Sequence, residues 1–192
     1  MGAATVNAKP RGEETQMNLD EYRALVLRVM ENSRSGENPG PRVFDNYGAD
    51  HARIVLETIF KHAKTDIRVY AEKLNRKTFD AQWIQEFLDR CPDGNIRILA
   101  EKDVFSDPES ALYEFRGHVS ERMEFRLARV RGLHMTIGDG NFVRVETSHN
   151  EREAVISFGD SKLSQMATDK FETLWQSGEP LSAPRDLNVD SG

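Results

Sequence analysis

The chain has 192 residues, of which 38% are hydrophobic and 30% charged, and it contains one cysteine. This length is typical of one domain, and a single cysteine excludes a disulfide framework and any all-cysteine metal site. The net charge of −6 disfavours global attraction to nucleic acid, although a local basic patch stays compatible with it. The longest apolar run, Ala24–Leu27, is too short for a transmembrane helix or a signal-peptide core. We therefore expect a cytoplasmic protein that does not associate with a membrane.

The two ends of the chain differ in composition from its middle. Asn18 followed by Glu21 resembles a capping box, and apolar residues at helical spacing then predict a helix from about 19 to 32. A stretch rich in serine, glycine and proline follows it. The chain is thus expected to divide into a disordered leader (1–16), an N-terminal helix and linker (17–40), an α/β domain (41–178) and a disordered tail (179–192).

Within residues 41–178, predicted strands and helices alternate and then give way to strands alone. The first group comprises a short extended piece at Arg42–Phe44, a helix capped by Asp50, a strand at Ile67–Tyr70, a helix starting at Asp80, a strand at Ile96–Ala100 and a helix from Asp107-Pro108 to about Gly117. The second comprises strands at Met123–Leu127, Leu133–Ile137, Phe142–Val145 and Ala154–Phe158, and a closing helix capped by Asp160. This order predicts an α/β fold with a mixed β-sheet flanked by helices.

The sequence contains no recognisable pattern for a metal or a cofactor. Its five histidines are scattered, and no pair stands four residues apart on one helix. The glycine-rich stretch Gly138–Asn141 lies between two predicted strands and opens no helix, which indicates a hairpin turn and not a phosphate-binding loop. We therefore expect neither a metal nor a cofactor.

Two features remain as candidates for a functional site. Arg126, Arg129 and Arg131 belong to a cluster of arginines that forms either a solvated, ion-paired face or an anion-binding groove. His134 begins a predicted strand, two positions before Thr136. An isolated histidine in a strand serves either as a structural residue or as a catalytic one.

The order of these elements, together with Leu133-His-Met-Thr-Ile-Gly-Asp-Gly140, resembles the phospholipase D superfamily. The resemblance covers about residues 42–177 and corresponds to one half of the usual two-lobed enzyme. The family motif is H-x-K-x4-D, whose histidine attacks phosphorus and whose lysine binds the phosphate oxygens. The resemblance implies that His134 stands at the position of the nucleophile and Thr136 at that of the lysine. Asp139 follows His134 by five positions, whereas the motif requires seven.

These departures from the motif favour a protein without the parent chemistry. A threonine brings no cation to the transition state, and losing one preorganised donor alone costs about 10²–10³ in rate. We therefore expect a non-catalytic phospholipase D-like half-domain that serves as a binding or assembly module, associating with itself or with another protein. The alternative is a metal-independent phosphodiesterase or nuclease, in which a homodimer pairs two His134 nucleophiles. In that alternative, arginines 126, 129 and 131 bind phosphate beside Thr136, and Asp139 is a further catalytic candidate.

Overall fold

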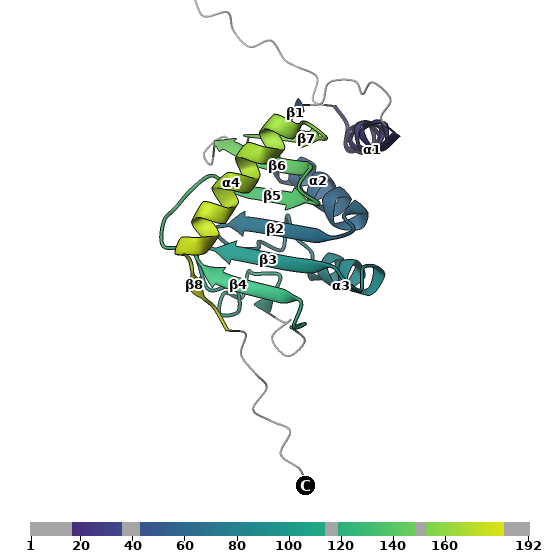
Figure 1. Ribbon diagram of the computed structural model, residues 1–192. Helices are drawn as coiled ribbons and strands as arrows, with labels where there is room; N and C mark the ends of the chain where they lie inside the picture. Colours follow the sequence, from purple (N-terminus) through teal and green to yellow (C-terminus); the bar gives the residue numbers. More distant parts are fainter. Residues whose placement is uncertain (1–16, 36–42, 114–118, 149–152, 183–192) are drawn as a thin grey trace, which may run out of the picture.

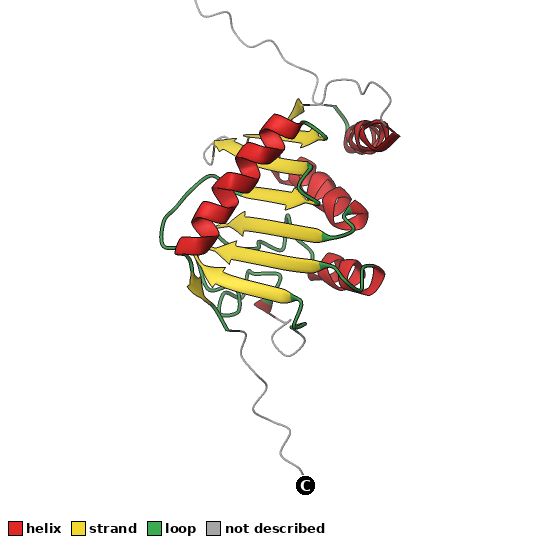
Figure 2. Cartoon of the chain, in the orientation of Figure 1, coloured by secondary structure: helices red, strands yellow, loops and turns green. Residues whose placement is uncertain are grey.

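An eight-stranded mixed β-sheet with helices on both faces forms the body of the protein (Figures 1 and 2). The computed structural model describes residues 17–35, 43–113, 119–148 and 153–182. The strands are β1 (Val43–Tyr47), β2 (Asp66–Ala71), β3 (Asn95–Ala100), β4 (Met123–Leu127), β5 (Met135–Gly138), β6 (Phe142–Ser148), β7 (Glu153–Phe158) and β8 (Glu179–Pro180), in the spatial order β1-β7-β6-β5-β2-β3-β4-β8. The helices are α1 (Leu19–Ser35), α2 (Gly48–His62), α3 (Ala81–Arg90) and α4 (Ser161–Ser177). The predicted fold class is confirmed.

The sheet combines a parallel centre with an antiparallel flank. The parallel centre consists of β2, β3 and β4. On the other side of β2, each strand pairs antiparallel with the one before it, in the order β5, β6, β7 and β1. Helix α4 crosses one face, and α2 and α3 cover the other (Figure 1). Apolar residues fill both interfaces, with Phe171 and Tyr70 on the α4 side and Phe60 and Ile96 on the side of α2 and α3. Two buried layers therefore fix the sheet between its helices.

The caps and the turn that the sequence indicates form largely as expected. Asp160 accepts hydrogen bonds from the first turn of α4, and Asp80 accepts one from the first turn of α3. The hairpin of β5 and β6 turns at the glycine-rich stretch, with Gly138 paired to Phe142. Asp50, in contrast, lies within the first turn of α2, because that helix already begins at Gly48. An acidic residue there still interacts favourably with the helix dipole.

The predicted helix from Asp107-Pro108 is wrong for the part that the structure describes. Residues 108–112 form turns around a β-bridge between Ser110 and Asn75, and residues 114–118 lie outside the described residues. Backbone hydrogen bonds join this loop to the loop after β2: Arg76 donates to Glu109 at 3.2 Å and Ala111 donates to Leu74 at 2.7 Å. These nonlocal bonds use the backbone groups that a helix would need, so tertiary pairing overrides the local signal.

The C-terminal strand and helix α1 refine the expected ends of the domain. Residues 179–180, expected in the tail, pair with β4 as β8, and Leu181 donates its N–H to the carbonyl of Phe125 at 2.9 Å. The predicted N-terminal helix forms as α1, which buries Tyr22 and Val26 against α2 and the sheet. The leader 1–16 and residues 183–192 of the tail lie outside the described residues. No helix that the structure describes is long and apolar enough to span a bilayer.

Candidate functional site

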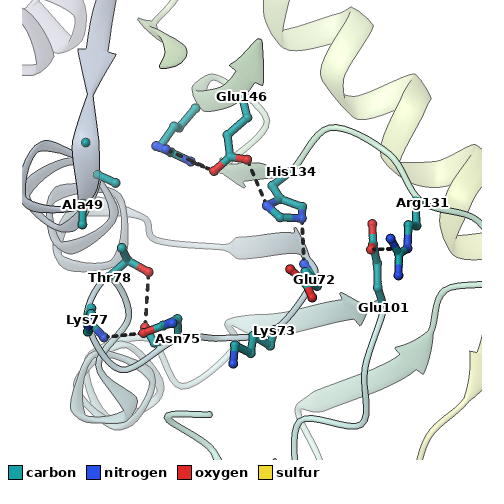
Figure 3. A pocket seen from close by; sticks show the side chains of 13 residues that line it. Ala49, Glu72, Lys73, Asn75, Lys77, Thr78, Glu101, Arg131, His134 and Glu146 are labelled. Carbon is teal, nitrogen blue, oxygen red and sulfur yellow. Dashed lines mark hydrogen bonds and ion pairs between the residues drawn. The ribbon is translucent and has the colours of Figure 1, made fainter. Parts of the chain in front are cut away.

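A cavity of about 500 Å³ opens at the edge of the sheet where the parallel strands β2 and β3 end (Figure 3). The start of α2 and the loops after β2 and β3 form its walls, together with the segment before β5 and the later residues of β6. Its lining comprises Gly48, Ala49, Ala52, Glu72, Lys73, Asn75, Lys77, Thr78, Glu101, Arg131, His134, Arg144 and Glu146. The carboxyl ends of parallel strands are the usual place for ligand sites in α/β folds. We call this cavity the His134 pocket.

Both ring nitrogens of His134 make contacts with the protein. Nδ1 lies 3.0 Å from a carboxylate oxygen of Glu146, and Nε2 accepts the backbone N–H of Glu72 at 2.8 Å (Figure 3). An acceptor at Nε2 requires that the ring proton be on Nδ1, where it is donated to Glu146. The ring also lies nearly perpendicular to that of Tyr70, with 6.0 Å between the ring centroids. The imidazole is therefore held in one orientation and one tautomer.

A buried arginine, Arg144, contacts the same carboxylate as His134 from its other side. Arg144 has a side chain only 7% exposed, and its guanidinium lies 3.3 Å from Glu146. Burial raises the pKa of Glu146, but hydrogen bonds and charge from His134 and Arg144 outweigh burial and lower the pKa to about 2. Burial lowers the pKa of Arg144, and Glu146 opposes that effect. The carboxylate is thus stabilised in its charged form between two nitrogen bases.

Arg144 lies beside the position where the family motif has its lysine. Thr136 on β5 is directly opposite Arg144 on β6, so both side chains project from the same face of the sheet. Thr136 itself is buried and does not line the cavity. Arg144 is not among the residues predicted from the sequence, although the predicted turn at Gly138–Asn141 contained the signal. A hairpin closed there sets residue 144 opposite residue 136.

The cations that line the pocket differ in how strongly they are paired with acidic side chains. Lys73 contacts both Asp107 and Glu109. The side chain of Arg131 is 87% exposed, and its Nε forms a long ion pair with a carboxylate oxygen of Glu101, at 3.7 Å. The ammonium of Lys77 has no ion-pair partner among the side chains that the structure describes. The lining contains four lysines and arginines and three glutamates, so the pocket is slightly positive in a chain of net charge −6.

Only one of the three expected arginines reaches this pocket. Arg126 donates to the carbonyl of Trp175 at 2.8 Å and stacks on its ring at 4.7 Å, which places it under α4. Arg129 pairs with Glu179 of β8, the edge strand beside β4. Arg131 alone lines the cavity. Most of the arginine cluster therefore stabilises the packing of α4 and β8, in keeping with its ion-paired interpretation.

Asp139 lies at the far end of β5 from His134. Its carboxylate accepts the backbone N–H groups of Lys64 and Thr65, at 2.9 and 2.8 Å, and the hydroxyl of Thr65 at 2.9 Å. It also adopts a positive φ of 52°, as the hairpin turn requires. The structure therefore keeps Asp139 apart from His134. The hydrogen bonds of Asp139 instead anchor the loop between α2 and β2.

No metal site is evident near these residues. Among the residues that the structure describes, no three His, Cys, Asp or Glu side chains gather closely enough to hold a metal ion. The ring nitrogens of His134 and the carboxylate of Glu146 are instead bonded to Arg144, to each other or to the backbone.

Comparison with known proteins relates the chain to others by structure, whereas its sequence matches no family model and no curated protein. The phospholipase D family member Nuc from Salmonella typhimurium aligns with a TM-score of 0.56 at 14% identity, over 73% of this chain and 97% of that one. NucT from Helicobacter pylori aligns with a TM-score of 0.54 at 12% identity, over 72% of this chain and 98% of that one. TrmBL2, an archaeal chromatin protein with a novel mode of DNA binding, aligns with a TM-score of 0.56 at 17% identity, over 84% of this chain and 64% of that one. The chain therefore has the phospholipase D-like fold.

Proposed function

We propose that this chain is a non-catalytic phospholipase D-like module that binds a phosphate-bearing ligand in the His134 pocket without cleaving it. The observation that carries the proposal is the hydrogen bond from the backbone N–H of Glu72 to Nε2 of His134, at 2.8 Å. An imidazole attacks phosphorus through an unprotonated ring nitrogen. Here one ring nitrogen donates to Glu146 and the lone pair of the other accepts the Glu72 amide.

The missing lysine supports the same conclusion. Attack on a phosphodiester places negative charge on the equatorial oxygens, and a cation beside them is a large part of the catalytic effect. Thr136 provides no charge, and the guanidinium of Arg144 is bound to Glu146. The charge of Arg144 is therefore already offset before a substrate arrives, so its effect on the transition state is reduced.

The pocket nevertheless keeps features that suit an anion. The first turn of α2 borders it, and the N-terminus of a helix attracts negative charge. Lys77 and Arg131 are exposed at its rim and only weakly engaged by acidic groups. The likeness to TrmBL2, described as a DNA-binding chromatin protein, also supports a binding role for this fold.

A second candidate is the metal-independent phosphodiesterase or nuclease that acts as a homodimer. The contact of 3.0 Å between Glu146 and Nδ1 of His134 favours it, because a carboxylate in that position would orient a histidine nucleophile and stabilise its positive charge. For this function the bond from Glu72 to Nε2 must open when substrate binds.

Hydrolysis assays separate the two candidates. The wild type, His134→Ala and Thr136→Lys are compared on bis-p-nitrophenyl phosphate and on single-stranded DNA, with and without chelator. We expect background turnover from all three, including Thr136→Lys, because the Nε2 lone pair stays bonded to Glu72. Wild-type turnover that persists in chelator and disappears in His134→Ala would establish the phosphodiesterase instead.

Binding by the pocket is tested with a matched pair of lysine variants. Lys77→Glu reverses a charge at the pocket, and Lys170→Glu reverses an exposed charge on α4, away from it. Titration of a phosphorylated probe such as a p-nitrophenyl phosphate monoester, followed by calorimetry, should show weaker binding for Lys77→Glu and unchanged binding for Lys170→Glu. Equal affinity of both variants and the wild type would refute binding at this pocket.

Self-association is part of the proposal and has its own test. A half-domain of a two-lobed fold exposes the surface that would face the missing lobe, and a two-fold homodimer is the simplest way to cover it. We expect a dimer with the His134 edge of the sheet at or near the interface. Sedimentation equilibrium at tens of micromolar distinguishes the dimer from a monomer, and a monomer would contradict this part of the proposal and the homodimeric phosphodiesterase alike.

A further inference from the structure

A second cavity, of about 520 Å³, lies at the other end of α2, beside the starts of β2 and β3. These strand starts are the arrow tails in Figure 1, at the sheet edge opposite to the His134 pocket. The cavity is lined by Arg34, Lys61, His62, Lys64, Arg90, Cys91, Pro92 and Asp93. Its lining residues come from α1, α2, α3 and the loops that follow α2 and α3, and they include four lysines and arginines, one histidine and one carboxylate. We call this cavity the basic groove.

Helix capping explains some of these cations. The guanidinium of Arg90 donates to the carbonyls of Phe60 and Ala63, at 2.7 and 3.1 Å, at the end of α2. The guanidinium of Arg34 lies at the longer distance of 3.5 Å from the carbonyl of His62. Cations at the C-terminus of a helix interact favourably with its dipole. This structural role accounts for Arg90 and, in part, for Arg34.

Capping does not account for the remaining charges. The side chain of Lys64 is exposed and has no hydrogen-bond or ion-pair partner among the side chains that the structure describes. The guanidinium of Arg34 also approaches Nδ1 of His62 to 3.5 Å, although both groups can be cationic. Lys61 pairs with Glu57 on the outer side of α2. Neither Lys64 nor Arg34 thus has a carboxylate partner among the side chains that the structure describes, and Asp93 is the one acidic residue in the lining of the groove.

The surroundings of His62 reflect the same positive field. Burial lowers the pKa of His62, and the charges of Arg34 and Arg90 lower it further, whereas Glu31 acts in the opposite direction. An anion placed among Arg34, His62 and Lys64 would offset the repulsion between their charges and accept hydrogen bonds from their side chains. A tetrahedral oxyanion suits this arrangement, since its oxygens point to donors on several elements at once.

We propose that the basic groove is a binding site for phosphate groups of a nucleic-acid backbone, separate from the His134 pocket. The site would be formed by Arg34 of α1, His62 of α2 and Lys64 of the following loop. Phosphate contacts of this kind do not depend on base sequence and weaken as salt rises. The inference does not depend on the proposed function, since it uses none of the residues of the His134 pocket.

The test titrates the full chain with a single-stranded oligonucleotide and follows the imidazole resonances of His62 by NMR. The key variant is Lys64→Glu, and the matched control is Lys170→Glu, which reverses an exposed charge on α4. We expect the His62 resonances to shift on titration. Affinity should fall at least about fivefold in Lys64→Glu and stay unchanged in Lys170→Glu. Replacing Lys64 by alanine should reduce the slope of log affinity against log salt by about 0.7, the value for one contact to a single strand.

Two further probes identify the chemistry that is bound. Inorganic phosphate should shift the same His62 resonances at higher concentration, whereas polyglutamate at equal charge should bind more weakly than the oligonucleotide. Equal binding of polyglutamate would overturn the assignment to phosphate and indicate a general polyanion surface. Unshifted His62 resonances, or equal affinity of the two charge-reversal variants, would overturn the site itself. Failure here leaves the His134 pocket unaffected, because that pocket is tested with Lys77→Glu.

Discussion

Replacing Glu146 by glutamine tests whether the buried charges behind His134 stabilise the fold. The side chain of Glu146 is 17% exposed and lies between His134 and Arg144. Glutamine keeps the shape of the side chain but removes its negative charge. The variant then leaves Arg144 buried beside a neutral group, which is the costly way to break an ion pair.

The size of the effect follows from the pKa of Glu146. Folding lowers it from 4.5 to about 2. At about 1.4 kcal/mol for each pKa unit, this shift corresponds to about 3 kcal/mol of stability. Because the folded pKa is the lower one, the contribution is fully present above the unfolded pKa and is lost as the pH falls through the folded value. The stabilising effect of the charge should therefore disappear between about pH 5 and pH 2.

Urea denaturation at a series of pH values, followed by tryptophan fluorescence, measures this contribution. At pH 7 the free energy of unfolding should be about 3 kcal/mol lower for Glu146→Gln than for the wild type, and the two should converge as the pH approaches 2. The control is Glu124→Gln, which changes an exposed glutamate on β4 and should have little effect. Equal stability of Glu146→Gln and Glu124→Gln at pH 7 would show that the contacts of Glu146 with His134 and Arg144 do not stabilise the fold.

Two other positions give predictions about stability. Asp139→Asn should lower the free energy of unfolding by about 2 kcal/mol, because the charged acceptor of the N–H groups of residues 64–66 is lost, whereas asparagine still tolerates the positive φ. Chemical denaturation measures this free energy, and a decrease below about 0.5 kcal/mol would contradict the anchoring role of Asp139. Gly159→Ala should loosen α1, because a Cβ there would lie 2.3 Å from Oγ of Ser33 and the φ of +90° disfavours any side chain. Amide hydrogen exchange should then be faster in α1 than in the wild type while the central strands keep their protection, and unchanged exchange in α1 would contradict this prediction.

The sequence alone determined the fold class and most of the element boundaries. The structure follows the local signals of the sequence, which are the alternation of apolar residues, caps such as Asp80 and Asp160, and the turn at Gly138–Asn141. The helix expected after Asp107 failed because its backbone groups bond to residues 74–76, which are near only in the folded chain. Local signals are reliable where no distant partner competes for the same hydrogen bonds.

The candidate site was only partly accessible from the sequence. The motif indicated His134, but the bond from Glu72 to its Nε2 joins two loops that are far apart in the chain. The cation near Thr136 is Arg144, on the next strand, and not one of the neighbouring arginines in the sequence. A sequence specifies which side chains are present and on which face of a strand they project. Tertiary structure alone decides which of them meet, because each contact at this site depends on how separate segments pack around the edge of the sheet.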